Sequence, residues 1–182
     1  TGTSTAAPVS VDCQAGWNAN CRVVIHYESH LHPLWSLPRQ QFGADGQLVA
    51  DNTCIVCHST RDQAGAQRVP AGQLDLSDGA SDQVSTQFRA YRELLATDNE
   101  QELVDGALQD RLVQTGVDPD GRPIYSPVPV PPSMSPAGAR ASVAFFSKFA
   151  TGGSHAGWLS AAELRLISEW LDIGAQYFND PF

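Results

Sequence analysis

The sequence has no run of apolar residues long enough to cross a bilayer, and it has few charges. Asp, Glu, Lys and Arg make up only 17% of the chain, and the basic residues number 11 against 20 acidic ones. The formal net charge of −9 disfavours nucleic acid and anionic membrane surfaces as partners. We therefore expect no membrane span and no nucleic-acid binding, and we expect any protein partner to be cationic.

The sequence also lacks an initiating methionine and a signal peptide, since it starts at Thr1. We interpret it as a mature or excised piece of an exported protein. Residues 1–10 have the Thr, Ser, Ala, Gly and Pro composition of a linker. The predicted organisation is an N-terminal arm over residues 1–10 followed by one domain over residues 11–182, which is long enough for a core of its own.

One short motif carries most of the chemical information: residues 54–58 read Cys-Ile-Val-Cys-His. The spacing C-x-x-C-H is the attachment signature of a c-type haem. Each thiol forms a thioether with a haem vinyl group, and the adjacent histidine becomes the proximal iron ligand. The motif predicts one covalent haem c, bound through Cys54 and Cys57, with His58 on the iron.

Two other uses of the motif stay open at this stage. A zinc knuckle needs a second pair of ligands at similar spacing, but the remaining cysteines, Cys13 and Cys21, lie far upstream. A redox dithiol is typical of a chain with a βαβ pattern, which this sequence does not show. The histidine that directly follows Cys57 favours haem over both alternatives.

Cys13 and Cys21 remain as a pair once the motif has used the other two thiols. They bracket a short polar loop, and we expect them to form a disulfide in an oxidising compartment. The alternative is two free thiols in a reducing cytosol. With the haem motif, the disulfide predicts a periplasmic or extracellular protein.

The residue opposite His58 decides what a haem iron can do, because a strong sixth ligand favours electron transfer and an open site permits catalysis or gas binding. Met134, the only methionine, lies in a proline-rich loop. His155 lies in a glycine-rich loop just before the last predicted helix. The other histidines, His26, His30 and His32, lie upstream of the motif.

The spacing of apolar residues predicts a mostly α-helical domain with long loops and one β-hairpin. The final helix has the clearest signals, since Ser160 and Glu163 can form a capping box and Leu159 can pack on Leu164. The other predicted elements are a helix from about residue 28, a helix capped by Ser81 and ending near residue 96, a hairpin over residues 111–130 and a helix over residues 135–152.

Two stretches resemble bacterial cytochrome c domains. The run from His155-Ala156-Gly157-Trp158-Leu159-Ser160 through Trp170-Leu171-Asp172 to Gly174-Ala175 resembles the end of that group, in which the axial ligand precedes a Leu-Ser helix. Residues 25–35 look like its opening helix. The pattern is also similar to the C-terminal haem domain of the hydrazine synthase alpha subunit, whose covalent haem has two histidine ligands.

The resemblance implies a cytochrome c-like helical domain around one covalent haem, with His155 as the sixth ligand and Met134 as its rival. It does not extend over residues 61–135. We expect a monohaem c-type cytochrome that transfers electrons to a redox partner and is not itself an enzyme. The alternatives are a haem enzyme or gas sensor with an open sixth site, or a haem-bearing module of a larger secreted complex or filament.

Overall fold

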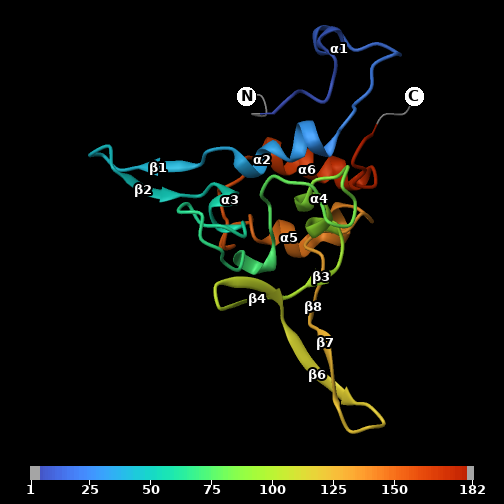
Figure 1. Cartoon of the computed structure of the whole chain (residues 1–182). Helices are drawn as coiled ribbons and strands as arrows, with labels where there is room; N and C mark the ends of the chain where they lie inside the picture. Colours follow the sequence, from blue (N-terminus) through green and yellow to red (C-terminus); the bar gives the residue numbers. More distant parts are fainter. Residues whose placement is uncertain (1–4, 180–182) are drawn as a thin grey trace.

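The computed structural model describes residues 5–179, and Figure 1 shows the course of the chain. The elements are short and follow the order α1 (Val11–Ala15), η1 (Tyr27–Leu31, a π-helix), α2 (Pro33–Ser36), β1 (Gln40–Phe42), β2 (Leu48–Asp51), α3 (Cys54–Cys57), η2 (Ala71–Gln73), α4 (Arg89–Leu95), β3 (Asp98–Asn99), β4 (Gln101–Val104), β5 (Ala107–Asp110), β6 (Leu112–Val117), β7 (Pro123–Pro127), β8 (Pro129–Val130), η3 (Ala139–Ser142), α5 (Val143–Ser147) and α6 (Ala161–Asp172).

The prediction of a mostly helical, cytochrome c-like fold is wrong. The chain is a mixture, 28% helical and 19% strand, and its strands form four separate two-stranded sheets. Three of these are hairpins, β1–β2, β4–β5 and β6–β7, and the fourth pairs β3 with β8. Glycine or proline stands at the end of two short helices, since Gly16 follows α1 and Pro38 comes two residues after α2.

The core is built around aromatic rings that join the two ends of the chain. Tyr27 is fully buried, with its ring 5.5 Å from that of Trp170 and 5.1 Å from that of Tyr91. Its hydroxyl accepts a hydrogen bond from the indole of Trp35 at 3.0 Å. Its amide donates to the carbonyl of Tyr177 at 2.9 Å. The segment from η1 to α2 is therefore fixed against α4, α6 and the residues that follow α6.

The prediction for the last helix is confirmed. The hydroxyl of Ser160 accepts from the amide of Glu163 at 3.2 Å, and the Glu163 carboxylate accepts from the amide of Ser160 at 2.7 Å. Leu159 is buried, and Leu164 packs against the core. Such a capping box satisfies backbone N–H groups that the first helical turn cannot pair, and so it fixes where α6 begins.

The other helix predictions are wrong in their extents. Ser81 caps only a turn: its hydroxyl accepts from the amides of Gln83 and Val84, and α4 does not begin until Arg89. Ala80 and Phe88 form an isolated antiparallel bridge, which holds the intervening chain in an extended loop. The predicted helix over residues 135–152 is reduced to η3 and α5.

The predicted hairpin over residues 111–130 is confirmed as β6–β7, and in Figure 1 it extends well beyond the body of the molecule. The β4–β5 hairpin before it was not predicted. Its turn residues, Asp105 and Gly106, have φ values of 50° and 80°. Two positive φ values are what a type I′ turn requires, and Asp-Gly is a strong sequence signal for it.

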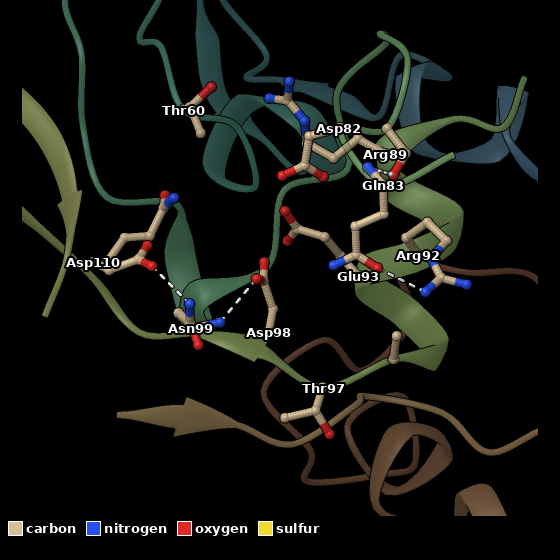
Figure 2. Close-up of a pocket in the computed structure, with 13 residues that line it drawn as sticks. Thr60, Asp82, Gln83, Arg89, Arg92, Glu93, Thr97, Asp98, Asn99 and Asp110 are labelled. Atoms are coloured by element: carbon tan, nitrogen blue, oxygen red, sulfur yellow. Dashed lines mark hydrogen bonds between the residues drawn. The ribbon is translucent and has the colours of Figure 1, made fainter. Parts of the chain in front are cut away.

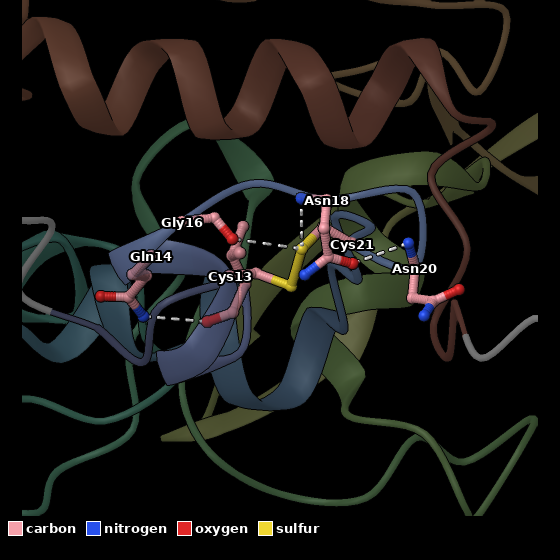
Figure 3. The surroundings of a disulfide bond; sticks show 7 residues. Cys13, Gln14, Gly16, Asn18, Asn20 and Cys21 are labelled. Atoms are coloured by element: carbon pink, nitrogen blue, oxygen red, sulfur yellow. Dashed lines mark hydrogen bonds between the residues drawn. A yellow bond between two sulfur atoms is a disulfide. The ribbon is translucent and has the colours of Figure 1, made fainter.

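The predicted disulfide is confirmed: Cys13 and Cys21 are bonded, with their Cα atoms 5.6 Å apart. Figure 3 shows the loop that they close, where the amide of Asn18 donates to the sulfur of Cys21 at 3.3 Å. Between residues 5 and 179, no helix combines the length and the apolar character that a membrane crossing demands. Of the predicted arm, residues 1–4 lie outside the described part. Pro8 contacts the body, since its carbonyl accepts from the amide of Val24 at 2.8 Å.

Candidate functional site

The C-x-x-C-H motif forms a single helical turn, α3, whose backbone is held at both ends. The amide of His58 donates to the carbonyl of Cys54 at 2.8 Å, and the carbonyl of His58 accepts from the amide of Leu76 at 2.9 Å. Neither Cys54 nor Cys57 is in a disulfide; Cys54 is buried and Cys57 is exposed. Burial raises the pKa of the Cys54 thiol, and the nearby Arg39 guanidinium opposes that effect.

His155 lies beside His58 although 97 residues separate them along the chain. The centres of the two imidazole rings are 6.1 Å apart, and their planes are inclined by 32°. A ring nitrogen lies about 1.1 Å from the ring centre and a metal–imidazole bond is about 2.0–2.1 Å long. Two imidazoles on opposite sides of one metal therefore have ring centres about 6.2–6.4 Å apart. The observed separation fits a pair of axial ligands.

The surroundings of the two rings favour the neutral imidazole, which is the form that binds a metal. Burial lowers the pKa of His58; the carbonyls of Leu74 and Ala71 oppose this effect, and the charges of His155 and Lys148 add to it. Burial also lowers the pKa of His155, with a further contribution from Lys148. Lys148 is the only lysine of the chain.

The Nδ1 atom of each ring, which would not bind the metal, lies near a polar group of a neighbouring residue. Nδ1 of His155 lies 2.8 Å from the hydroxyl of Ser154, which leaves Nε2 for a ligand. Nδ1 of His58 is buried and makes no regular hydrogen bond to any described residue, although the Leu74 carbonyl is close enough to affect the pKa of the ring. Metal-binding histidines commonly donate their other N–H to a backbone carbonyl. The carbonyls of Leu74 and Ala71 are the candidate acceptors here.

The loop that carries His155 is fixed by a close approach to α5. The amide of His155 donates to the carbonyl of Lys148 at 2.8 Å. A Cβ atom at Gly153 would collide with the carbonyl oxygens of Ser147 and Lys148, so only glycine fits there. The ring of His155 lies 4.4 Å from that of Trp158 and 5.6 Å from that of Phe149, measured between centres. Aromatic side chains thus enclose the outer side of this ring.

Arg39 joins the two halves of the site, one through its side chain and the other through its backbone amide. Its guanidinium donates to both carboxylate oxygens of Glu163, at 2.9 and 3.3 Å, and to the carbonyl of Trp158 at 2.7 Å. Its amide donates to the hydroxyl of Thr53, the residue just before α3, at 2.9 Å. The side chains of Arg39 and Glu163 are only 12% and 4% exposed.

Burial alone would raise the pKa of Glu163, but hydrogen bonds from Arg39 and Ser160 outweigh it and hold the pKa below the usual range. The Glu163 carboxylate therefore serves the capping box and the ion pair in its charged form. The sequence gives no local signal for this role of Arg39, because its partner lies 124 residues away. Lys148 and Ser154 were also missed as neighbours of the ring pair.

The other candidate ligands lie in different surroundings. Met134 is only 2% exposed, and its amide donates to the carbonyl of Leu94 at 2.8 Å, so it packs as a core residue. His32 stacks on Phe88 with ring centres 4.1 Å apart and bonds to Asp78 at 2.7 Å. His30 accepts at Nδ1 from the amide of His26 at 2.9 Å. The ring contact of His58 is with His155.

Nowhere in residues 5–179 do three or more His, Cys, Asp or Glu side chains gather as a metal site. A structural zinc site takes four such ligands. A redox dithiol needs an accessible attacking thiol, and here Cys57 is exposed while Cys54 is buried. The geometry of the two thiols therefore does not separate this use from haem attachment, and the adjacent His58 remains what favours haem.

A polar pocket of about 360 Å³ lies beside α4, separate from the two rings. Figure 2 shows charged groups of both signs around it, among them Glu93, Arg89 and Asp98. Glu93 accepts from the amide of Asp75 at 2.6 Å. Burial raises the pKa of Glu93 to about 7; the Asp75 amide opposes this, and the charges of Asp75 and Asp98 add to it.

Comparisons with known proteins give no further guidance: no family model, no curated protein and no solved structure matches this chain.

Breaking the buried ion pair should destabilise the fold strongly. Arg39→Met leaves the Glu163 carboxylate buried without its cation and should lower the free energy of unfolding by about 3–5 kcal/mol. The double variant Arg39→Met/Glu163→Gln should recover a large part of this loss, since glutamine is uncharged and can still accept from Ser160. Urea unfolding measures both.

Arg111→Met is the matched control for this experiment, because the Arg111–Glu100 pair has a similar length, 2.8 Å, but is largely exposed. Its loss should change the stability little. Equal effects of the Arg39 and Arg111 substitutions would contradict the role given to the buried pair.

Glu93 should make the stability depend on pH. Its pKa in the folded state, about 7, lies above the unfolded value of about 4.5, so ionisation is disfavoured in the fold. Stability should therefore fall as pH rises from 4.5 to 7. Glu93→Gln should remove this fall and stabilise the protein by about 1–3 kcal/mol at pH 8 relative to the wild type. A difference between the two proteins that does not change with pH would contradict this prediction.

Proposed function

We propose that this chain is a monohaem c-type cytochrome that transfers electrons, with Cys54 and Cys57 as attachment points and His58 and His155 as the two iron ligands. The observation that carries the proposal is the pair of imidazole rings, 6.1 Å apart, one of which directly follows the C-x-x-C spacing. A shared metal ion would explain why two partly buried imidazoles from such distant parts of the sequence lie at this separation.

The use of cysteine supports the same proposal. Cys13 and Cys21 are joined to each other, whereas Cys54 and Cys57 are free although they lie on one helical turn. A chain that forms one disulfide and leaves a C-x-x-C pair open is consistent with thiols reserved for covalent attachment. We place the protein in the periplasm or outside the cell, because the Cys13–Cys21 disulfide is typical of an oxidising compartment.

A bound haem would supply one-electron redox chemistry. The residues of this chain would fill both axial positions, limit access of water through Phe149 and Trp158, and hold the two ligand segments together through Arg39 and Glu163. Filling both positions favours electron transfer over catalysis or gas sensing, because no site is left for a substrate. Two imidazoles also give a lower potential than a histidine–methionine pair.

The resemblance to bacterial cytochrome c domains is part of this proposal only for the residues that carry it, 25–35, 54–58 and 155–175. The strands and hairpins between them do not belong to a mostly helical fold. The redox partner should carry a positive surface, because the net charge of the chain is −9 and haem propionates would add to it.

The attachment is tested by extraction. Acid–acetone should leave the colour with the protein, and the mass of the intact chain should exceed the sequence mass by one haem group. Replacing both Cys54 and Cys57 by alanine should let the colour move to the solvent. Colour that leaves the wild-type protein completely would contradict covalent attachment.

The ligand pair is tested by substitution at its distal member. His155→Ala should convert a low-spin spectrum to a high-spin one and should create affinity for carbon monoxide, because the sixth position becomes open. Met134→Ala is the control and should keep the low-spin spectrum, although it should lower the stability by about 2–5 kcal/mol as a core truncation. The opposite pattern would identify Met134 as the ligand and would contradict the assignment of His155.

A further inference from the structure

The β6–β7 hairpin has one outer edge that is blocked and one that is open. Proline stands at both ends of β7, where Pro127 pairs with Leu112 and Pro123 pairs with Val117. The pairs just outside them are hydrogen-bonded, since the amide of Asp118 donates to the carbonyl of Arg122 and that of Val128 donates to the carbonyl of Arg111.

Hydrogen-bonded and non-hydrogen-bonded pairs alternate along an antiparallel ladder. The two proline pairs are therefore non-hydrogen-bonded, and their backbone groups face outward. On the β7 side the two proline positions have no N–H to offer, so that edge is blocked at both ends and leaves only the amide of Tyr125 between them. On the β6 side, the amides and carbonyls of Leu112 and Val117 face outward, and no other strand of residues 5–179 pairs with them.

The open edge lacks the features that usually prevent strand pairing. β6 reads Leu-Val-Gln-Thr-Gly-Val, with no charged residue and no proline. The other two hairpins differ, because β2 ends in Asp51 and the β4–β5 hairpin contains Glu102, Asp105 and Asp110. In an acidic chain these carboxylates repel a second copy, whereas β6 does not.

The two ends of β6 are alike in chemical type about the bond between Gln114 and Thr115. Antiparallel pairing of β6 with the same strand of a second copy places Leu112 opposite Val117, Val113 opposite Gly116, and Gln114 opposite the bulge residue Thr115. An apolar residue then meets an apolar one at both ends of the paired segment. Along a strand, the backbone N–H and C=O groups of successive residues point to opposite edges. The bulge at Thr115 shifts this alternation by one residue, so the backbone groups of both Leu112 and Val117 point to the same outer edge.

The exposure of the hairpin gives the pairing its driving force. Leu112 is 54% exposed, Val117 is 61% exposed and Tyr125 is 56% exposed, on a two-stranded ribbon that extends away from the body (Figure 1). A two-stranded hairpin alone is only marginally stable in water, and additional strands stabilise it. Because the hairpin extends outward, the acidic bodies of two copies can stay apart while the strands pair.

We propose that the open edge of β6 is a self-association surface: two copies pair their β6 strands about a two-fold axis and form one four-stranded sheet, β7–β6–β6–β7. The blocked edges of β7 then lie on the outside of this sheet, so the assembly stops at the dimer. This proposal is independent of haem binding, and the following tests do not read out the iron.

Cysteine cross-linking tests the register. In the proposed pairing, residue 112 of one copy lies opposite residue 117 of the other, within the Cα separation of about 4.4–6.8 Å that a disulfide spans. A mixture of the single variants Leu112→Cys and Val117→Cys of the full chain should therefore form a disulfide-linked dimer on mild oxidation. Either variant alone should not, because like residues lie about 17 Å apart. A mixture of Leu112→Cys with Tyr125→Cys is the control and should also stay unlinked.

Sedimentation of the purified full chain measures the association without any substitution. The mass should rise from 19.5 kDa towards twice that value between about 1 and 500 μM protein. Val117→Lys should raise the dimer dissociation constant at least about tenfold, since it places a charge on the paired edge. Ile124→Lys, which adds the same charge on β7, should change it much less.

A wild-type chain that is monomeric over the whole concentration range would overturn the proposal. Equal effects of the two lysine substitutions would overturn it as well, and so would cross-linking in the Tyr125 control. A pure chain that stays monomeric but binds an unrelated strand peptide would assign the edge to a different partner.

Discussion

The buried ion pair between Arg39 and Glu163 is the interaction on which the candidate site depends. The guanidinium of Arg39 donates to a carboxylate that also caps α6 and to the backbone carbonyl of Trp158 beside His155. The backbone N–H of Arg39 donates to Thr53, the residue before the C-x-x-C-H turn. The attachment motif and the distal ligand loop are thus both tied to Arg39. The desolvation of the ion pair is costly, and the remaining hydrogen bonds to Ser160 and Trp158 are what offset that cost.

The scaffold around this pair explains how a chain with little regular structure can hold two rings at a fixed separation. Each ring is set by a backbone constraint at its own segment: a single helical turn at Cys54–His58, and the close packing of Gly153 on α5 in the other loop. The aromatic core, from Tyr27 to Trp170, fixes η1 against α6, the helix that follows the His155 loop. Most residues of the hairpins are exposed and lie outside the core. In one of them, β6–β7, strand β6 has an edge that can pair with another strand.

Local signals were readable from the sequence, and interactions between distant residues were not. The capping box of Ser160 and Glu163, the Cys13–Cys21 disulfide and the β6–β7 hairpin depend on residues at most 15 positions apart. Asp105-Gly106 was equally readable and was missed. The length of α4 depends on Tyr177 and Ala80, which bond to Phe88 just before the helix. The role of Arg39 depends on Glu163. Tertiary packing brings these partners together, so neither periodicity nor propensity could predict them. The mostly helical prediction was wrong because early helix ends and separate hairpins replaced the expected long helices.

The most direct test of the account is the visible absorption spectrum of the wild-type holoprotein in its oxidised and reduced forms. Two imidazole ligands predict a six-coordinate, low-spin spectrum in both states, with split bands on reduction and no weak far-red band in the oxidised form. After reduction, the same sample should not bind carbon monoxide rapidly, because both axial positions are filled. A far-red band would point to methionine, and a high-spin spectrum that binds carbon monoxide, or a protein without haem, would contradict the central claim.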